Sequence, residues 1–193
     1  MRRFLPTLRA AGLAGALSTA PLAAQSAPAK PPVVATNALV PAVAADVASI
    51  DAIMAAVYDV ISGPAGKARD WNRFRSLFAP HARLIPTGRN AAGVGVIRPW
   101  TVEEYITNAG ASLERDGFYE RELGRKTERY GNIVHLMSAY DSRRTPADAT
   151  PFARGVNSFQ LWFDGTRWWV VTIYWEGETP ANPIPADFLR KAP

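Results

Sequence analysis

The sequence predicts an α+β domain in which helices cover one face of a strongly curved antiparallel sheet. Apolar residues recur at every third or fourth position in the first half of the domain, which is typical of helices with one buried side. Long segments rich in aromatic and β-branched residues follow after residue 117 and are typical of strands. Helices followed by a run of strands favour an α+β fold over alternating strands and helices.

Residues 1–25 have the pattern of a secretory signal peptide, with a basic start, an apolar run of small residues and alanine-rich cleavage positions. Pro21 and Gln25 interrupt that run, whereas a membrane-spanning helix needs roughly 20 apolar residues. We therefore expect export, to the periplasm or out of the cell, and no stable membrane insertion.

The Pro- and Ala-rich residues 26–45 predict a tether, so that the folded domain would cover 46–193 and begin near Asp46. The first 45 residues hold four basic residues and no acid, and removing these four charges from the formal +5 leaves +1. A nearly neutral domain gives no electrostatic reason to expect nucleic acid as a partner. The chain has no cysteine, which excludes a disulfide framework.

Three helices are expected in the first part of the domain. The first ends at the sequence SGPAG, and the second follows a capping aspartate and stops before Pro80. In the third, Thr101 and Glu104 form a capping box, in which each side chain bonds to the other residue's backbone. The predicted ranges are 46–61, 70–79 and 101–115.

The predicted strands cover 82–86, 118–130, 133–141, 152–163 and 167–176, with a Gly-rich loop after the first. We expect the last two strands to be joined by a three-residue turn, because this register pairs the most apolar faces. It places Asn157 opposite Ile173 and Phe159 opposite Val171. Trp169 and Trp175 then face the core together with Val171 and Ile173.

The opposite face of these strands is also aromatic and holds few charges. Its predicted residues are His135, Met137, Trp162, Trp168, Val170 and Tyr174. Such a composition is typical of the centre of a protein interface. We therefore expect a homodimer through this outer face, or else the C-terminal segment TPANPIPADFL folded back over it.

Two segments, DWNRFRSLFAPHARL and RGVNSFQLWFDGTRWWVVTIYWEGE, resemble the NTF2-like (SnoaL-like) family. The resemblance covers most of 46–178 and implies a cone of three N-terminal helices packed on a curved antiparallel sheet. It also implies a pocket between the first helix and the concave face. Because this fold carries isomerases, cyclases, dehydratases and proteins without catalysis, it implies no single function.

The steroid isomerases of the family imply three positions in that pocket. Their hydrogen-bond donors correspond to Tyr58 and Asn157, and their general base corresponds to Pro86. Proline cannot accept a proton, so the resemblance does not support isomerisation by the family's route. The acids weighed as a replacement are Glu120, Asp141 and Glu178. Glu120 and Glu122 share one face of a strand, and we expect both to be solvated.

The preferred hypothesis is an exported protein that binds a small hydrophobic molecule in the cone pocket, without a metal or cofactor. Tyr58 and Asn157 would be its polar anchors. The apolar lining or core would comprise Trp71, Phe159, Val171 and Trp175. The alternatives are a lyase, isomerase or hydrolase acting on a polyketide- or steroid-like substrate, and a dimeric association module whose cone is filled with side chains.

Overall fold

A computed structural model describes residues 40–190, so the signal peptide and most of the tether lie outside the described residues. The helices are α1 (Ala44–Val47), α2 (Ile50–Ile61), α3 (Trp71–Ser76), α4 (Val102–Asp116) and the 3₁₀ helix η1 (Ala186–Leu189). The strands are β1 (Phe78–Arg89), β2 (Gly95–Ile97), β3 (Tyr119–Tyr130), β4 (Ile133–Arg143), β5 (Ala153–Phe163) and β6 (Trp168–Gly177). No helix in this range is long and apolar enough to cross a membrane.

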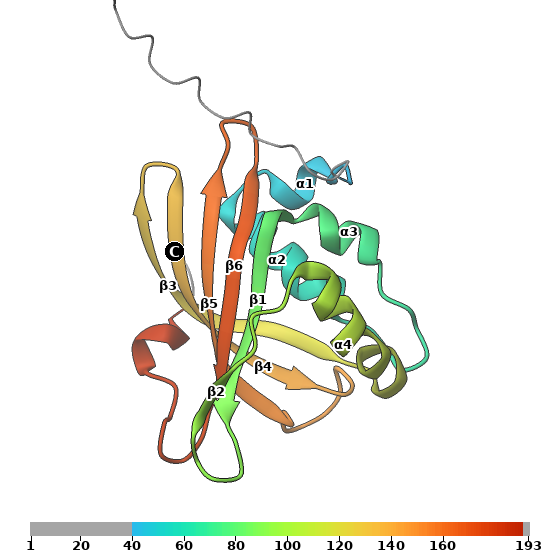
Figure 1. Cartoon of the computed structure of the whole chain (residues 1–193), viewed down its shortest axis with the longest axis vertical. Coiled ribbons are helices and arrows are strands. Elements are labelled where there is room, and N and C mark those ends of the chain that lie inside the picture. The colour runs from blue at the N-terminus through green and yellow to red at the C-terminus, as the bar shows by residue number, and fades with distance from the viewer. Residues whose placement is uncertain (1–39, 191–193) are drawn as a thin grey trace, which may run out of the picture. The chain divides into compact units, whose positions relative to one another are not determined.

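The six strands form one open sheet in the order β2-β1-β6-β5-β4-β3. All neighbours are antiparallel except β1 and β6, which run parallel, so the sheet is mixed where an antiparallel one was predicted. Figure 1 shows α2, α3 and α4 on one side of the sheet and the C-terminal segment with η1 on the other. The helices therefore cover the concave face, and the outer face is the face away from them.

The first predicted helix is divided into α1 and α2. Ser49 starts α2 as its N-cap, and its side chain accepts a hydrogen bond from the backbone of Ala52 at 3.0 Å. Val47 of α1 is buried, and Ala42 packs against the same core. The packed chain therefore begins a few residues before Asp46, inside the segment predicted to be a tether.

The other two helices agree with their predicted caps. The Asp70 side chain accepts from the backbone of Arg73 at 2.9 Å and starts α3. Both bonds of the Thr101–Glu104 capping box are present at the start of α4. The short strand predicted over 82–86 extends in both directions. Residues 87–89 pair with β2, which is part of the Gly-rich loop, and Phe78 at the other end pairs with Val170 of β6.

The join between β5 and β6 differs from the prediction. Phe163 pairs with Trp168 across a four-residue turn, in which the Asp164 side chain accepts from the backbone of Thr166 and Arg167. This register continues to the pair of Leu161 with Val170 and shifts after it. The next pair is Gln160 with Thr172, which leaves Val171 as the extra residue of a β-bulge.

This bulge reverses which residues of β6 point to the core. Before it, Trp168 and Val170 are buried in the core, although both were predicted on the outer face. Val171 was predicted in the core and is 37% exposed. After the bulge, Ile173 and Trp175 face the concave side, as predicted, but they pair with Phe159 and Asn157. One extra residue thus accounts for the apolar residues on both sides of this strand.

A second register shift lies in β3, between Glu122 and Gly124. It brings Arg125 onto the side of the sheet that faces α2, where Arg125 forms ion pairs with Glu122 and with Asp51 of α2. The Arg125 side chain is almost completely buried by these contacts. The prediction that Glu122 is solvated is therefore wrong.

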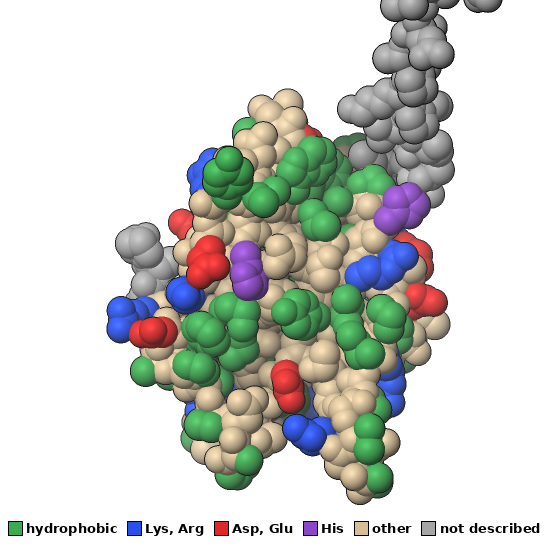
Figure 2. All heavy atoms as spheres, turned by 60° about the vertical axis from the view of Figure 1, so that its left-hand side comes forward, with side chains coloured by type: hydrophobic (Ala, Val, Ile, Leu, Met, Phe, Trp, Pro, Cys, Tyr) green, Lys and Arg blue, Asp and Glu red, His purple; other side chains and the backbone are tan. Residues whose placement is uncertain are grey.

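The C-terminal segment crosses the outer face. Helix η1 packs against β3 and β4, and the backbone of Arg125 donates to the carbonyl of Arg190 at 2.9 Å. Phe188 lies beside His135 and Met137, two residues predicted at the dimer interface. On this side of the molecule, Figure 2 shows hydrophobic side chains in several groups with charged side chains between them. Part of the predicted interface is thus covered by the chain itself.

Candidate functional site

A cavity of about 300 Å³ lies between the helices and the concave face of the sheet. It is lined by Val57, Tyr58, Ile61, Phe74, Leu84, Pro86, Trp100, Tyr105, Ala109, Leu113, Phe118, Glu120, Tyr140, Ser142, Phe152, Ala153, Asn157, Phe159, Ile173 and Trp175. Four of the six predicted site residues are in this set: Tyr58, Asn157, Phe159 and Trp175. The association-module hypothesis requires a cone filled by its own side chains. The cavity contradicts this requirement.

The other two predicted site residues lie elsewhere. Trp71 packs between helices, with its ring 5.6 Å from that of Phe74 and against Gly110 of α4. A side-chain carbon added at Gly110 would come within 3.1 Å of the Trp71 ring, so glycine allows this close packing. Val171 points away from the cavity because of the bulge in β6. Trp71 therefore supports the helices, and Val171 belongs to the outer face.

Tyr58 and Asn157, the two predicted polar anchors, are hydrogen-bonded to each other. Asn157 Nδ2 donates to Tyr58 Oη at 3.2 Å and to Glu120 Oε1 at 3.3 Å. Tyr58 Oη lies 2.7 Å from Ser138 Oγ, and Ser138 Oγ donates to Glu122 Oε1 at 2.7 Å. Because a serine hydroxyl has one hydrogen, the hydrogen between Tyr58 and Ser138 comes from Tyr58.

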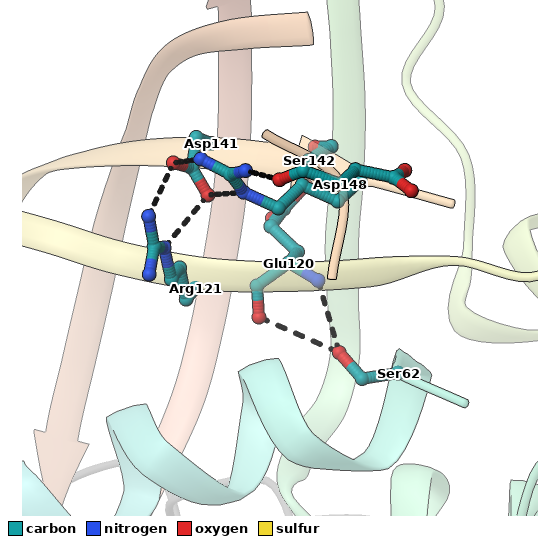
Figure 3. Close-up of polar contacts among 7 residues, drawn as sticks. Ser62, Glu120, Arg121, Asp141, Ser142 and Asp148 are labelled. Carbon is teal, nitrogen blue, oxygen red and sulfur yellow. Dashed lines mark hydrogen bonds and ion pairs between the residues drawn. The ribbon is translucent and has the colours of Figure 1, made fainter. Parts of the chain in front are cut away.

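Glu120 is the acidic group of the cavity. It lies on β3, opposite Ser142 on β4, and Ser142 Oγ donates to Glu120 Oε2 at 2.9 Å. Its backbone nitrogen donates to Ser62 Oγ at 3.0 Å, which fixes this part of β3 to the end of α2. Figure 3 shows Glu120 on β3, with Ser62 and Ser142 on the neighbouring elements. The prediction that Glu120 is solvated is wrong, because its carboxyl group faces the cavity.

Burial raises the pKa of Glu120 from 4.5 to about 7. The hydrogen bonds from Ser142 and Asn157 act in the opposite direction, and the nearby charge of Asp141 raises the pKa further. Glu120 can therefore gain or lose a proton near neutral pH. The pKa of Tyr58 is raised by its burial and by the negative charge of Glu120, so Tyr58 remains a neutral hydroxyl.

Glu120 also borders a groove of about 650 Å³ that is lined by residues of α2 and β3, many of them charged. Tyr58 and Glu120 line both spaces, whereas Ser62, Arg121 and Arg125 line only the groove. Glu120 thus stands between an apolar interior and a charged surface. This position gives its carboxyl group a short path to exchange protons with water.

The two other acids weighed as replacements do not line the cavity. Asp141 is held by Arg121 at 2.9 Å and by Arg143 at 3.0 Å. Burial alone would raise the pKa of Asp141, but the hydrogen bonds from these two arginines outweigh burial and lower it. Glu178 pairs with Arg154 at 3.0 Å and lines a groove on the outer face. Pro86 does line the cavity, so the position of the family's base faces the interior.

Sequence reasoning named Glu120 without placing it in the cavity. The alternation along β3 shows that Glu120 and Glu122 share a face, but it does not show that this face meets α2. The hydroxyl groups of Ser62 and Ser142, which hold Glu120, lie far from it in the sequence. Among the described residues, no group of three or more His, Cys, Asp or Glu side chains is arranged to hold a metal ion.

No family model and no curated protein matches the chain. Solved structures do resemble it. A protein of unknown function with a cystatin-like fold from Nostoc punctiforme has a TM-score of 0.50 and 14% identity, over 68% of this chain and 90% of that one. The chain shares the cystatin-like fold of that protein.

Two further solved structures resemble the chain less closely. An NTF2-like protein of unknown function from Silicibacter pomeroyi has a TM-score of 0.45 and 12% identity, over 68% of this chain and 94% of that one. An NTF2-like superfamily protein from Salmonella enterica has a TM-score of 0.44 and 14% identity, over 71% and 87% of the two chains. At such identities the likeness extends to the fold alone.

Proposed function

We propose that this NTF2-like protein is exported and binds a small, largely apolar organic molecule in the cavity. The observation that carries the proposal is the cavity itself, about 300 Å³ in volume, with nine aromatic residues and one carboxyl group among its lining. Concave, mostly apolar sites with a few placed polar groups are the usual form of small-molecule sites. A volume of 300 Å³ corresponds to about ten water molecules, so the ligand has roughly ten non-hydrogen atoms.

The proposal is tested by filling the cavity from α4. Ala109 lines it, whereas Ala111 on the same helix is exposed. We expect 2-phenylethanol, a neutral probe of suitable size, to bind the full chain in titration calorimetry. Ala109→Leu should abolish this binding without lowering the melting temperature, and Ala111→Leu should leave it unchanged. Equal binding by all three proteins would refute the cavity as the site.

A second candidate function is supported by the position and pKa of Glu120. A carboxyl group with a pKa of about 7 inside an apolar cavity suits general acid or base catalysis at neutral pH. In this function Glu120 is the general base, in place of the position that Pro86 occupies, and accepts a proton from a carbon next to a carbonyl group. The substrate class would be a small aryl or alicyclic ketone, for a lyase or isomerase.

Deuterium exchange tests this second function. In D₂O, the native protein should accelerate exchange of the hydrogens next to the carbonyl of phenylacetone, as followed by NMR, and Glu120→Gln should not. Rates equal to that of buffer between pH 6 and 8 would exclude proton abstraction from this substrate class and leave binding as the function.

A further inference from the structure

Within 40–190, the ionisable side chains that line the cavity include an acid but no base. Among the described residues that line it, Glu120 is the single acid, and none is Lys, Arg or His. The three arginines near β3 are paired with other acids: Arg121 and Arg143 with Asp141, and Arg125 with Glu122 and Asp51. When Glu120 is ionised, it is therefore a carboxylate that forms no ion pair with the described residues.

The donors that contact Glu120 or its partner Asn157 are already used. Both hydrogens of Asn157 Nδ2 are donated, one to Tyr58 and one to Glu120, and the Tyr58 hydroxyl donates to Ser138. The Ser142 hydroxyl donates to Glu120. What remains is acceptor capacity: a further lone pair on each Glu120 oxygen, and Asn157 Oδ1, which has no donor among residues 40–190. A ligand group with several N–H donors suits this end of the cavity.

The walls of the cavity also suit a cation. Tyr105 of α4 stacks on Phe74 at 5.3 Å and meets the edge of Trp175 at 6.4 Å, which fixes these rings around the interior. Aromatic faces attract ammonium groups through their quadrupoles, most strongly where water is excluded. The hydroxyls of Tyr105 and Tyr140 have no hydrogen-bond partner in the described part of the chain. Each can accept from an ammonium group, and each also has a free O–H that can donate to an oxygen of the ligand.

We infer that the ligand is a primary or secondary amine, bound as its ammonium form, with nitrogen on Glu120 and an aromatic or branched apolar body among the rings. This inference rests on the proposed function, because it names the ligand class of the same cavity. An anionic ligand would place a second negative charge beside Glu120. A neutral ligand would leave the carboxylate without a counter-charge, which is costly inside an apolar site.

The pH dependence follows from the groups that face Glu120. These are Tyr58 of α2, Glu122 of β3, Tyr105 of α4, and Tyr140 and Asp141 of β4. The three tyrosines have raised pKa values and stay neutral, and Asp141 stays ionised between its arginines. Burial also raises the pKa of Glu122, although the hydrogen bond from Ser138 acts in the opposite direction, and Arg125 pairs with Glu122. With the Glu120 pKa at about 7, amine affinity should rise about tenfold between pH 6 and pH 8.

The test compares three probes with one body, by calorimetry on the full chain at pH 8: 2-phenylethylamine, 2-phenylethanol and 3-phenylpropanoate. We expect the amine to bind at least tenfold more tightly than the alcohol, and the carboxylate not to bind. Glu120→Gln should weaken the amine at least tenfold and leave the alcohol within threefold. Glu114→Gln, which removes an exposed carboxyl group of α4, should change neither affinity.

The outcomes separate the ligand class from the site. An alcohol that binds as tightly as the amine refutes the amine inference and leaves the proposed function standing. If none of the three probes binds, the proposed function falls together with it. Should Glu120→Gln fail to fold, the native protein still decides: an amine affinity that does not rise relative to the alcohol between pH 6 and 8 refutes the inference.

Discussion

Replacing Glu120 by glutamine should change how the stability of the protein depends on pH. The native pKa of Glu120 is about 7 against an ordinary value of 4.5. Between these values the native state binds more protons than the unfolded state, so the free energy of unfolding falls as pH rises. The contribution of Glu120 is complete below about pH 4.5 and lost above about pH 7.

The size of this effect follows from the shift. The difference between the native pKa of about 7 and the ordinary value of 4.5 corresponds to an upper limit of about 3 kcal/mol, since each pKa unit is worth about 1.4 kcal/mol. The glutamine side chain in Glu120→Gln has one oxygen where the carboxyl group accepts from both Ser142 and Asn157, which costs about 1 kcal/mol at every pH. Comparing two pH values removes this constant cost.

The assay is urea unfolding of the native and Glu120→Gln proteins at pH 5 and pH 8. We expect the variant to gain about 2–3 kcal/mol relative to the native protein between the two pH values. Glu176→Gln, at an exposed position of β6, is the control for removal of a carboxyl group outside the cavity. A relative change below about 0.5 kcal/mol for Glu120→Gln would refute a buried, uncompensated carboxyl group.

Three further predictions concern packing, the polar pair and association. In the same unfolding assay, Val170→Asp should destabilise the protein by about 3–5 kcal/mol and Val171→Asp by less than about 1 kcal/mol. The reason is that the bulge leaves Val170 buried and Val171 exposed, so equal losses would contradict the register. Tyr58→Phe should cost about 1–3 kcal/mol by leaving Asn157 and Ser138 short of a partner, and an unchanged midpoint would contradict these hydrogen bonds. In sedimentation, the native chain should be a homodimer and Trp162→Glu, at an exposed outer-face position, a monomer; a native monomer at micromolar concentration would count against association through this face.

The sequence predicted the helices and strands well because their signals are local. The Thr101–Glu104 capping box and the Asp70 cap each involve residues three apart, and both are present where expected. The four last strands lie within a few residues of their predicted bounds. Periodicity and capping report on neighbours in the chain, so they can be read without knowledge of the tertiary structure.

The register of β6 could not be predicted in the same way. Both sides of this strand are apolar, so hydrophobicity alone does not distinguish a regular strand from one with a bulge. A single extra residue at Val171 moves Trp168 and Val170 to the core and Val171 to the surface. The predicted outer face was therefore correct for Trp162 and Tyr174 and wrong for Trp168 and Val170.

The polar part of the site depends on contacts between distant segments. The resemblance to the family placed Tyr58 and Asn157 at the cavity. For the family's general base it gave only one position, and this position is occupied by Pro86. Glu120 enters the site because β3 crosses the end of α2, where Ser62 bonds to its backbone. A glutamate on a strand is ordinarily solvated. Burial at this position raises the pKa of Glu120 to about 7.

The central claim is that the interior of the cone binds a small molecule, and NMR of labelled methyl groups tests it most directly. Leu84, Ile61 and Ile173 line the cavity, whereas Ile97 and Ile133 are exposed outside it. On titration of the full chain with 2-phenylethanol and then 2-phenylethylamine, we expect saturable shifts at the three cavity residues and none at the two exposed ones. Shifts limited to Ile97 and Ile133, or no shifts with either probe, would contradict the account.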